Sequence, residues 1–551
     1  MTIQFELDGR QVDVADDGRS LLDVLREDLG ERSVKDGCSP QGQCGCCTVL
    51  VDGSPRVSCV TPARRVAGRQ VTTLAGFDDE RRRRWADAFC ATGASQCGFC
   101  TPGIVVRLEG LAAKEAATPR AAPDGDDALQ ARHASVARAL QAHLCRCTGW
   151  QSIVEAYDVA TARDAAVAPP ELAAEGDELP VVPAAGARGV RRDRAAAARR
   201  AGLEGGVPQR VDPAVVLGDA GFADDRAPAG ALVAVPDGRG GWSVGETLAE
   251  ARSVAGKVQG RRTTVEAAPP LAVPAGEWVR TLRTSWVEPG YLETDASWCE
   301  PGGEPASPLA NGGAFGAKAA SVVVDAAREL ADRHGRTVRV LLAREDCVRL
   351  GAKRPPLAAG VRADGSGVVH VARTPGIATA IGAVAPGLDV VELDLPGPPT
   401  SAAIRAAGWA EAAVLLASLD AATDVVRSPD GSTASASVGP DGTVSVHVAC
   451  GDPLDEVVLR SYCIGAAHMA LGWVSSEGLA VDGDGDVHDL TIRSFGILRA
   501  VDMPRIDVEI EPSDGPAVNG SDAVFAAVAA AVWRAQGHPA SWPTGRAVTA
   551  R

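Results

Sequence analysis

The sequence predicts an α+β protein of several domains. The chain has 551 residues, enough for about three to five domains of roughly 100–200 residues each. Short strand-like runs alternate with amphipathic helical segments along most of it. Ten of its 14 cysteines precede residue 148, so the N-terminal third differs chemically from the rest.

Charge and cysteine usage narrow the possible functions. The formal net charge is −16, which opposes binding to DNA, RNA or an anionic membrane. No apolar run approaches the ~18 residues of a membrane span, and the first residues lack a secretory signal. Clustered thiols in such a long chain indicate metal or redox chemistry in the reducing cytoplasm. We therefore expect a cytoplasmic protein without nucleic-acid or membrane partners.

Residues 1–76 are expected to form a small β-grasp domain. Ser20 opens an amphipathic helix that Gly30 ends, and a Gly/Cys-rich loop follows over 35–47. Five strand-like runs surround these features, and the first two are joined by a turn at 8–10. The strands are predicted at 2–7, 11–15, 48–51, 55–59 and 70–74.

Over 77–165 the apolar residues recur with the period of an α-helix. We expect a four-helix domain there, with helices near 79–92, 101–116, 127–144 and 151–165. Residues 166–202 are rich in Ala, Pro, Glu and Arg without a sustained period, and they are predicted to be a mobile linker. Residues 203–551 are expected to form a two-lobed α+β region with helices near 320–334, 402–418 and 522–536.

The first cysteine set has the spacing C-x5-C-x2-C-x11-C, with its members at Cys38, Cys44, Cys47 and Cys59. A plant-type [2Fe–2S] site has C-x4-C-x2-C and a distant fourth cysteine, so this loop is one residue longer. Glycines in the loop allow its backbone to wrap a cluster closely. Cys46 is a spare thiol, which leaves the ligand choice among 44, 46 and 47 open. Simple burial of four cysteines is the alternative.

The second set is Cys97, Cys100, Cys145 and Cys147. Two of these thiols come from a loop where a helix starts, and two come from the next helix junction. Four thiolates suit a second [2Fe–2S] cluster, although structural zinc also takes four cysteines.

Three sequence motifs show a specific family resemblance: C-G-C-C-T-V at 44–49, Q-C-G-F-C-T-P-G at 96–103 and C-R-C-T-G at 145–149. They resemble the iron–sulfur subunit of the xanthine dehydrogenase/aldehyde oxidase family of molybdenum hydroxylases. The resemblance covers residues 1–165 and implies two [2Fe–2S] clusters rather than zinc. It also implies that Gln96 touches a molybdopterin.

The remainder is similar to the molybdopterin-binding large subunit of that family. The resemblance implies that Gly312, Gly313, Phe315 and Gly316 bind the cofactor and that Arg405 belongs to the catalytic site. The similar segments lie at 222–225, 311–318, 344–346, 353–355, 405–408, 465–472 and 502–504.

This region also departs from the family pattern. It is much shorter than the usual large subunit, and 450–453 lacks the G-Q-G-x-x-T loop. The family's catalytic glutamate is matched by Asp522, within N-G-S-D at 519–522. Asp522 is therefore expected to act as the catalytic base or, alternatively or in addition, to cap the following helix.

The sequence thus predicts an oxidoreductase that hydroxylates an aldehyde or N-heterocycle and passes electrons through two [2Fe–2S] clusters. A molybdopterin-type molybdenum cofactor is the expected oxidising centre. Because no FAD domain separates the two resembling regions, a separate FAD-binding subunit or a soluble acceptor is expected to take the electrons. The alternative is an iron–sulfur electron-transfer or assembly protein whose large-subunit region has lost the cofactor.

Overall fold

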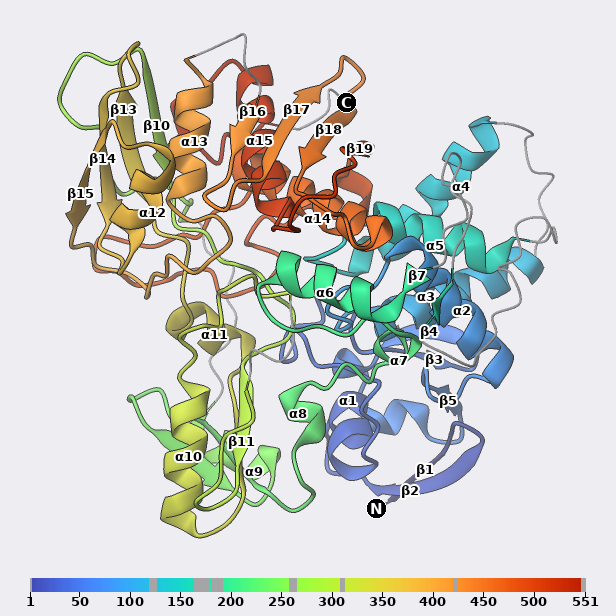
Figure 1. Cartoon of the computed structure of the whole chain (residues 1–551). Helices are drawn as coiled ribbons and strands as arrows, with labels where there is room; N and C mark the ends of the chain where they lie inside the picture. Colours follow the sequence, from blue (N-terminus) through green and yellow to red (C-terminus); the bar gives the residue numbers. More distant parts are fainter. Residues whose placement is uncertain are drawn as a thin grey trace.

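The computed structural model describes residues 2–117, 126–162, 178–180, 192–256, 265–307, 313–419 and 425–546. Figure 1 shows an N-terminal part at lower right, a helical part above it and a two-lobed C-terminal region on the left and at the top. Helices and sheets are mixed throughout, which confirms the predicted α+β class.

The N-terminal part is a five-stranded sheet of order β2-β1-β5-β3-β4 with its own hydrophobic core. Ser20 caps the predicted helix and Asp23 completes a capping box, but only one turn is α-helical. The chain continues as a π-helical segment, η1, over Val24–Asp28. The elements are β1 (Thr2–Leu7), β2 (Arg10–Ala15), α1 (Leu21–Asp23), β3 (Thr48–Val51), β4 (Ser54–Val57) and β5 (Gln70–Thr72).

Four helices follow, as the periodicity predicts. Asp78 caps the first of them, and Gly93 ends it in the left-handed conformation at φ 68°. The helices are α2 (Asp79–Thr92), α3 (Thr101–Ala117), α4 (Asp126–Ala139) and α5 (Gln151–Thr161).

Part of the segment predicted as a mobile linker is ordered. Strands β6 (Glu178–Leu179) and β7 (Arg192–Asp193) pair, and helix α6 spans Arg194–Gly205. Most of 166–191 lies outside the described residues. The linker prediction is wrong for 194–202 because Asp193 caps a run of strong helix formers, which buried contacts of Arg200 then anchor.

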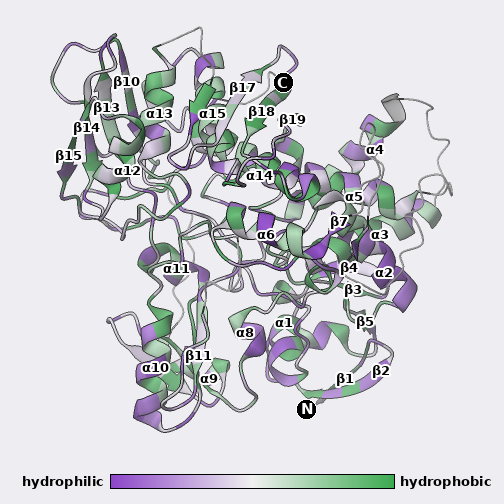
Figure 2. Ribbon diagram, viewed as in Figure 1, coloured by the Kyte–Doolittle hydropathy of each residue, from purple (hydrophilic) through white to green (hydrophobic). Residues whose placement is uncertain are grey.

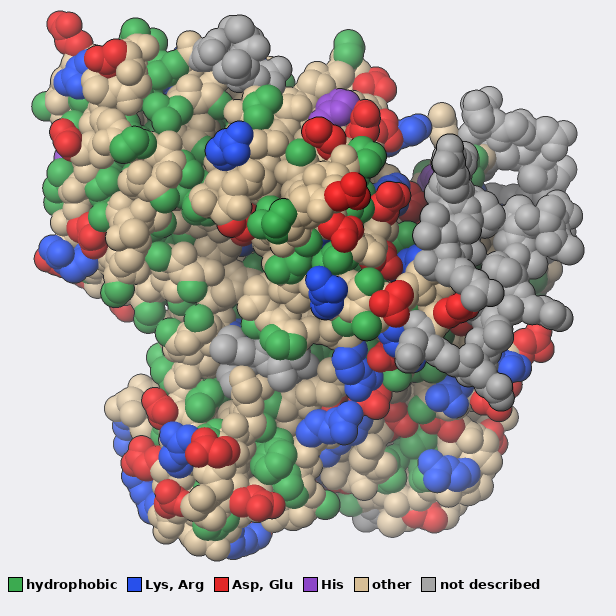
Figure 3. Space-filling view, in the orientation of Figure 1, with side chains coloured by type: hydrophobic (Ala, Val, Ile, Leu, Met, Phe, Trp, Pro, Cys, Tyr) green, Lys and Arg blue, Asp and Glu red, His purple; other side chains and the backbone are tan. Residues whose placement is uncertain are grey.

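One lobe of the C-terminal region, at lower left in Figure 1, carries the sheet β11-β12-β8-β9. Acidic and basic side chains are interspersed over its surface (Figure 3). Helix α7 (Pro213–Val216) lies outside this lobe and packs against α2. The elements of the lobe are α8 (Ala223–Arg226), β8 (Leu232–Pro236), β9 (Trp242–Gly245), α9 (Leu248–Ala255), β11 (Ala296–Cys299), α10 (Val323–His334), β12 (Val338–Leu341) and α11 (Arg344–Leu350).

The other lobe holds two sheets, of order β15-β14-β13-β10-β20 and β16-β17-β18-β19. The strands are β10 (Arg280–Thr284), β13 (Leu357–Val361), β14 (Gly367–Ala372), β15 (Leu388–Leu393), β16 (Val425–Arg427), β17 (Thr433–Val438), β18 (Val444–Ala449), β19 (Ile506–Ile510) and β20 (Ser541–Trp542). The helices are α12 (Ile377–Val384), α13 (Trp409–Ala417), α14 (Glu456–Ser475) and α15 (Ser521–Ala535).

Helix α14 lies at the centre of the main core. It is the one described helix with the length and hydropathy of a membrane span, yet 89% of that stretch is buried within the protein. It packs beside the largely hydrophobic α15 (Figure 2), and its core cluster includes residues of α2 to α5. The helical part and the C-terminal region therefore share one hydrophobic core.

Candidate functional site

The first cysteine set lies in a buried loop against the N-terminal sheet. The Cys38 Sγ accepts the backbone N–H of Gln41 at 3.2 Å and that of Gln43 at 3.5 Å. The Cys44 and Cys59 thiols also contact it, and together these donors hold the pKa of Cys38 well below its usual range. Cys59 in turn contacts Cys47. The contacts run from Cys44 through Cys38 and Cys59 to Cys47, so the four thiols form one connected set, which suits two irons with two thiolates each.

Cys46 is buried beside this set and contacts Cys44. A side chain on Gly37 would lie 3.1 Å from Cys46 Sγ, 3.2 Å from Cys44 Sγ and 3.2 Å from the Phe99 ring. A side chain would be tightly packed there, because the first cysteine loop, the spare thiol and the second cysteine segment meet at this point.

The second set is also held together by thiol contacts. The Sγ atoms of Cys97 and Cys147 are 3.7 Å apart, and Cys100 contacts Cys145. The Thr148 Oγ1 lies 3.1 Å from Cys145 Sγ. Two thiol pairs likewise suit two irons rather than one tetrahedral zinc. Within the described chain, no three Cys, His, Asp or Glu side chains are grouped as ligands of a single ion.

The two cysteine sets are joined by direct contacts. Leu144, next to Cys145, donates its N–H to the Cys44 carbonyl at 3.0 Å. His143 Nε2 lies 3.1 Å from Thr48 Oγ1, and burial lowers the pKa of this histidine to about 3. The contact region is therefore dry, with a neutral imidazole and a short through-bond route between the sets.

Both loops are also held by the C-terminal region. Arg344 of α11 donates to the Gly37 carbonyl at 3.0 Å, beside the first set. Arg146, between Cys145 and Cys147, makes a buried bidentate ion pair with Glu477 at 2.6 and 2.7 Å. The C-terminal region thus fixes the geometry of both thiol sets.

A cavity of about 280 Å³ in the C-terminal region is lined by Phe315, Gly316, Arg405 and Asp522, among others. This volume is just below the ~300–1,000 Å³ of typical ligand pockets. The Arg405 guanidinium stacks 3.8 Å from the centre of the Phe315 ring, and its Nε lies 2.9 Å from the Asp522 carboxylate. Burial raises the pKa of Asp522, although Arg405 opposes the rise.

The structure assigns the cap of α15 to residues other than Asp522. The Asn519 Oδ1 accepts the N–H of Asp522 at 2.9 Å, and the buried Glu204 carboxylate accepts the N–H groups of Gly520 and Ser521. The capping alternative for Asp522 is wrong, because its side chain instead pairs with Arg405. Sequence reasoning missed Glu204, which lies just after the predicted linker, at the start of the region predicted over 203–551, and belongs to none of the motifs.

Gln96 lies behind this cavity rather than in its wall. Its Nε2 donates to the Cys147 carbonyl and to Ser461 Oγ, while its buried Oε1 has no partner among the described residues. Tyr462 lines a separate small pocket together with Gln96, its ring lies 6.4 Å from that of the cavity residue Phe315, and its buried hydroxyl has no partner among the described residues.

The loop over 313–316 connects the second cysteine set with the cavity that Asp522 lines. A side chain on Gly313 would lie 3.0 Å from Cys97 Sγ and 3.2 Å from Cys147 Sγ, whereas Gly316 lines the cavity. Gly312 lies outside the described residues. The unpartnered Gln96 oxygen suits an N–H donor such as that of a pterin, and the glycine loop links it to the cavity, but Gln96 does not line that cavity and Arg405 is already bonded to Asp522 and Ser521.

Comparisons with known families agree with the cysteine geometry. The family described as 2Fe-2S iron-sulfur cluster binding domain matches residues 5–75. The family described as [2Fe-2S] binding domain matches residues 73–158.

Individual relatives are similar to this chain over the same N-terminal residues. The chain is 36% identical over 166 residues to the nicotinate dehydrogenase small FeS subunit of Eubacterium barkeri, covering 30% of this chain and 96% of that one. It is 38% identical over 138 residues to the xanthine dehydrogenase iron-sulfur-binding subunit of Escherichia coli O157:H7, covering 25% and 79%. It is 41% identical over 143 residues to the aldehyde oxidoreductase of Megalodesulfovibrio gigas, covering 25% of this chain but only 14% of that protein.

The whole fold also has solved counterparts. The aldehyde oxidoreductase of Desulfovibrio gigas matches over 97% of both chains with a TM-score of 0.64 and 15% identity. That of Desulfovibrio desulfuricans gives a TM-score of 0.65 over 96% of this chain and 97% of the other, also at 15% identity. At this identity the likeness concerns the fold of the C-terminal region and not its chemistry.

Proposed function

Because the chain belongs to the xanthine dehydrogenase/aldehyde oxidase family of molybdenum hydroxylases, we propose that it hydroxylates an aldehyde or an N-heterocycle at the cavity between Phe315 and Asp522. Its N-terminal part is the iron–sulfur portion of an oxidoreductase, with two [2Fe–2S]-binding domains. The eight thiols of the two sets are the proposed ligands. The observation that carries the proposal is the convergence of Asp522, Arg405 and Phe315 on one cavity.

A molybdenum cofactor bound here would supply the oxidising centre and the hydroxyl group. We propose that Gln96, Gly312, Gly313, Phe315 and Gly316 hold it. In support, Gln96 Oε1 is a buried acceptor without a partner, and the glycine loop runs from Cys97 and Cys147 to the cavity.

Asp522 is the proposed general base. It faces the cavity, and burial raises its pKa toward the range in which a carboxylate exchanges protons readily. Arg405 holds one carboxylate oxygen through its Nε, which fixes the orientation of the group. Asp522 is one methylene shorter than the glutamate of the family, so the base reaches less far into the cavity.

Electrons would enter the second cluster on the side of Cys97 and Cys147 and leave it on the side of Cys100 and Cys145. They would then reach the first cluster. The Leu144 to Cys44 hydrogen bond supports this order, because it joins the two sets directly. Several relatives are subunits of larger enzymes. We propose that a separate FAD-binding subunit or a soluble acceptor receives the electrons, so NADH alone should leave the purified chain oxidised.

The proposed organisation has four parts: a β-grasp [2Fe–2S] domain at 1–76, a helical [2Fe–2S] domain at 77–165, a connection at 166–202 and the shortened molybdopterin-binding region at 203–551. The two family matches, 5–75 and 73–158, support the first boundary. The proposed location is the cytoplasm, in keeping with the clustered free thiols.

Molybdenum analysis and substrate-driven reduction test this function together. Purified protein should contain close to one molybdenum per chain, and an aldehyde or N-heterocycle should bleach the iron–sulfur absorption. Dithionite serves as the control reductant. If dithionite bleaches the protein while molybdenum is absent and no substrate does so, the chain is instead an electron-transfer or assembly protein. The cavity volume, just below the usual range for ligands, gives that second function its support.

A further inference from the structure

A second and larger cavity lies between the N-terminal part and the lobe that carries α9. Its volume is about 520 Å³, well within the range of small-molecule pockets. One wall comes from η1 and the loop that follows it, and the other comes from β8 and α9. Five arginines line it: Arg19, Arg26, Arg32, Arg252 and Arg339.

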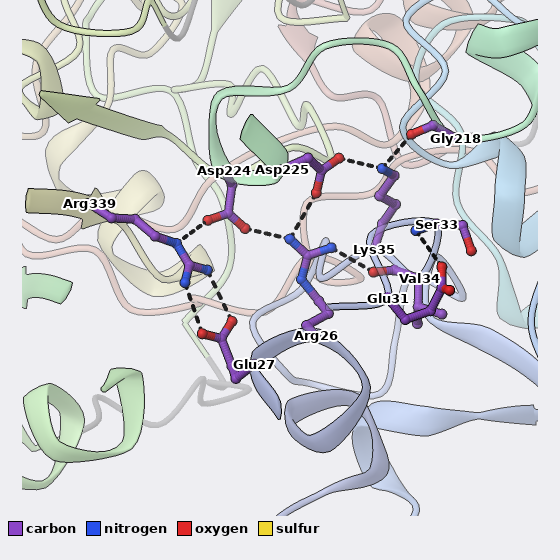
Figure 4. A network of polar contacts seen from close by, with 10 residues as sticks. All are labelled: Arg26, Glu27, Glu31, Ser33, Val34, Lys35, Gly218, Asp224, Asp225 and Arg339. Carbon is purple, nitrogen blue, oxygen red and sulfur yellow. Dashed lines mark hydrogen bonds and ion pairs between the residues drawn. The ribbon is translucent and has the colours of Figure 1, made fainter. Parts of the chain in front are cut away.

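Two of these arginines are fixed by a buried ion-pair network (Figure 4). Arg26 lies 2.7 Å from Asp224 and 2.9 Å from Asp225. Arg339 pairs with Glu27 at 2.9 Å and also with Asp224. Arg19 is separately paired with Asp28 at 2.6 Å. The carboxylates near these three arginines are therefore already neutralised.

Arg32 and Arg252 differ from the other three. Neither side chain makes a hydrogen bond or an ion pair with any described residue, and Arg32 Nη1 is buried without a partner. Burial lowers the pKa of Arg32, and the charges of Arg26 and Arg339 lower it further. Asp224 and Glu27 act on Arg32 in the opposite direction, but neither bonds it, and its buried Nη1 is a donor that an anion can satisfy.

The acidic groups that face the cavity do not supply that anion. Asp23 is engaged by Ser20, and Glu246 is paired with Arg336 at 2.7 Å. Asp36 attracts Arg252 electrostatically but receives its hydrogen bond from the Ser39 N–H. Asp36 is thus a carboxylate whose charge acts on Arg252, while the N–H donors of Arg32 and Arg252 make no hydrogen bond to a described residue and face one cavity.

We propose that this cavity binds a small polyanion carrying phosphate or carboxylate groups, with Arg32 and Arg252 as its ligands. A guanidinium presents a planar fork of N–H donors that matches either anion through two parallel hydrogen bonds. Arg32 belongs to the N-terminal part and Arg252 to α9. The bound molecule therefore bridges the two parts of the chain at a site separate from the cysteine sets and from the Asp522 cavity.

Isothermal titration of the cluster-loaded full chain tests this site, with pyrophosphate and citrate as the two probes in about 0.15 M salt. Pyrophosphate represents the phosphate class and citrate the carboxylate class, so their relative affinities identify which anion is preferred. We expect millimolar or tighter binding of at least one. Arg32→Ala and Arg252→Ala should each weaken it at least about tenfold, the usual effect of losing a charged hydrogen-bond donor.

Arg32→Lys should retain part of the affinity, since it keeps the charge but loses the fork. Arg64→Ala is the matched control, because Arg64 is exposed on the same N-terminal part and lies outside the cavity lining. Each variant should keep both iron–sulfur EPR signals, which shows that it is folded. The proposal is overturned if neither probe binds, or if Arg32→Ala and Arg252→Ala both bind as tightly as the unaltered chain.

Discussion

At the residue scale, the cysteine ligands are the most predictable part of the molecule. Their spacing is a local property, and the structure brings the four thiols of each set into contact with one another. The spacing left the choice among 44, 46 and 47 open. In the structure Cys44, Cys46 and Cys47 each contact another cysteine of the set, so the assignment of Cys44 and Cys47 as ligands stays a prediction.

Under this assignment, Cys46→Ala should leave both clusters in place. The variant removes a buried thiol that contacts only Cys44 among the first set, so both EPR signals of the reduced protein should persist. Cys47→Ala is the matched comparison and should abolish the signal of the first cluster alone. Loss of that signal in Cys46→Ala would refute the ligand assignment.

Asp522→Asn should slow reduction of the clusters by substrate by roughly 10²–10⁴-fold, the usual contribution of a general base. The amide keeps the shape of the carboxylate and a hydrogen bond to Arg405 but cannot take a proton. Stopped-flow absorption measures the rate, and Asp522→Glu should retain activity. Asp514→Asn, in an exposed loop of the same region, is the control. An unchanged rate in Asp522→Asn would remove this residue from the mechanism.

Glu204 is a residue near the candidate site that the sequence alone did not reveal. Its carboxylate binds the start of α15 from a distance of more than 300 residues along the chain. No local pattern marks such a contact, because it depends on how α6 packs against the C-terminal region. The Arg405 and Asp522 pair, 117 residues apart, was predicted through family resemblance and not through periodicity.

At the scale of elements, most helices and strands follow from local signals. Helix α2 begins after its Asp78 cap and ends before Gly93, as the sequence predicts. Helix α6 was missed because its Ala and Arg residues show no apolar period. Its stability comes from distant contacts, such as Arg200 bonding to the carbonyls of Pro453 and Val518.

The ion-pair network between η1, α8 and β12 should make the fold acid-sensitive. Burial alone would raise the pKa of Asp224, but Arg339 and Arg26 more than offset this and hold it well below its usual range. A lowered carboxylate pKa stabilises the fold above the unfolded value of about 3.9. That stability is lost as the pH falls from about 4 toward the folded pKa.

Asp224→Asn should accordingly lower the free energy of unfolding by about 3–5 kcal/mol near neutral pH, since it leaves two buried guanidinium groups underpaired. The difference from the unaltered chain should shrink below pH ~4. Urea unfolding at several pH values measures both effects. Glu246→Gln, which breaks the exposed pair with Arg336, is the control and should change stability little. If the difference in unfolding free energy between Asp224→Asn and the unaltered chain does not change with pH, the proposed role of the Asp224 carboxylate is contradicted.

At the scale of the whole molecule, the C-terminal region positions the clusters as well as forming the candidate catalytic cavity. The helical part shares its core with that region, and Arg344 and Glu477 reach back to the two cysteine loops. The α+β class and the order of parts were predictable from composition and motifs. The packing of α14 against α15, α6 and β19 was not, since it depends on contacts between distant segments.

Glu477→Gln should selectively weaken the second cluster. It breaks a buried bidentate pair with Arg146, which lies between two ligands, and removal of one partner from such a pair typically costs about 3–5 kcal/mol. EPR quantification should show reduced occupancy of the second cluster with the first retained. Glu511→Gln, an exposed change in the same region, should leave both signals unaltered. Equal loss of both clusters would point to general unfolding instead.

The central claim, two [2Fe–2S] clusters held by eight cysteines, is tested most directly by metal and acid-labile sulfide analysis of the purified chain. The account predicts about four irons and about four sulfides per chain, because each cluster contains two of each. Zinc without sulfide, or a single pair of irons, would contradict it.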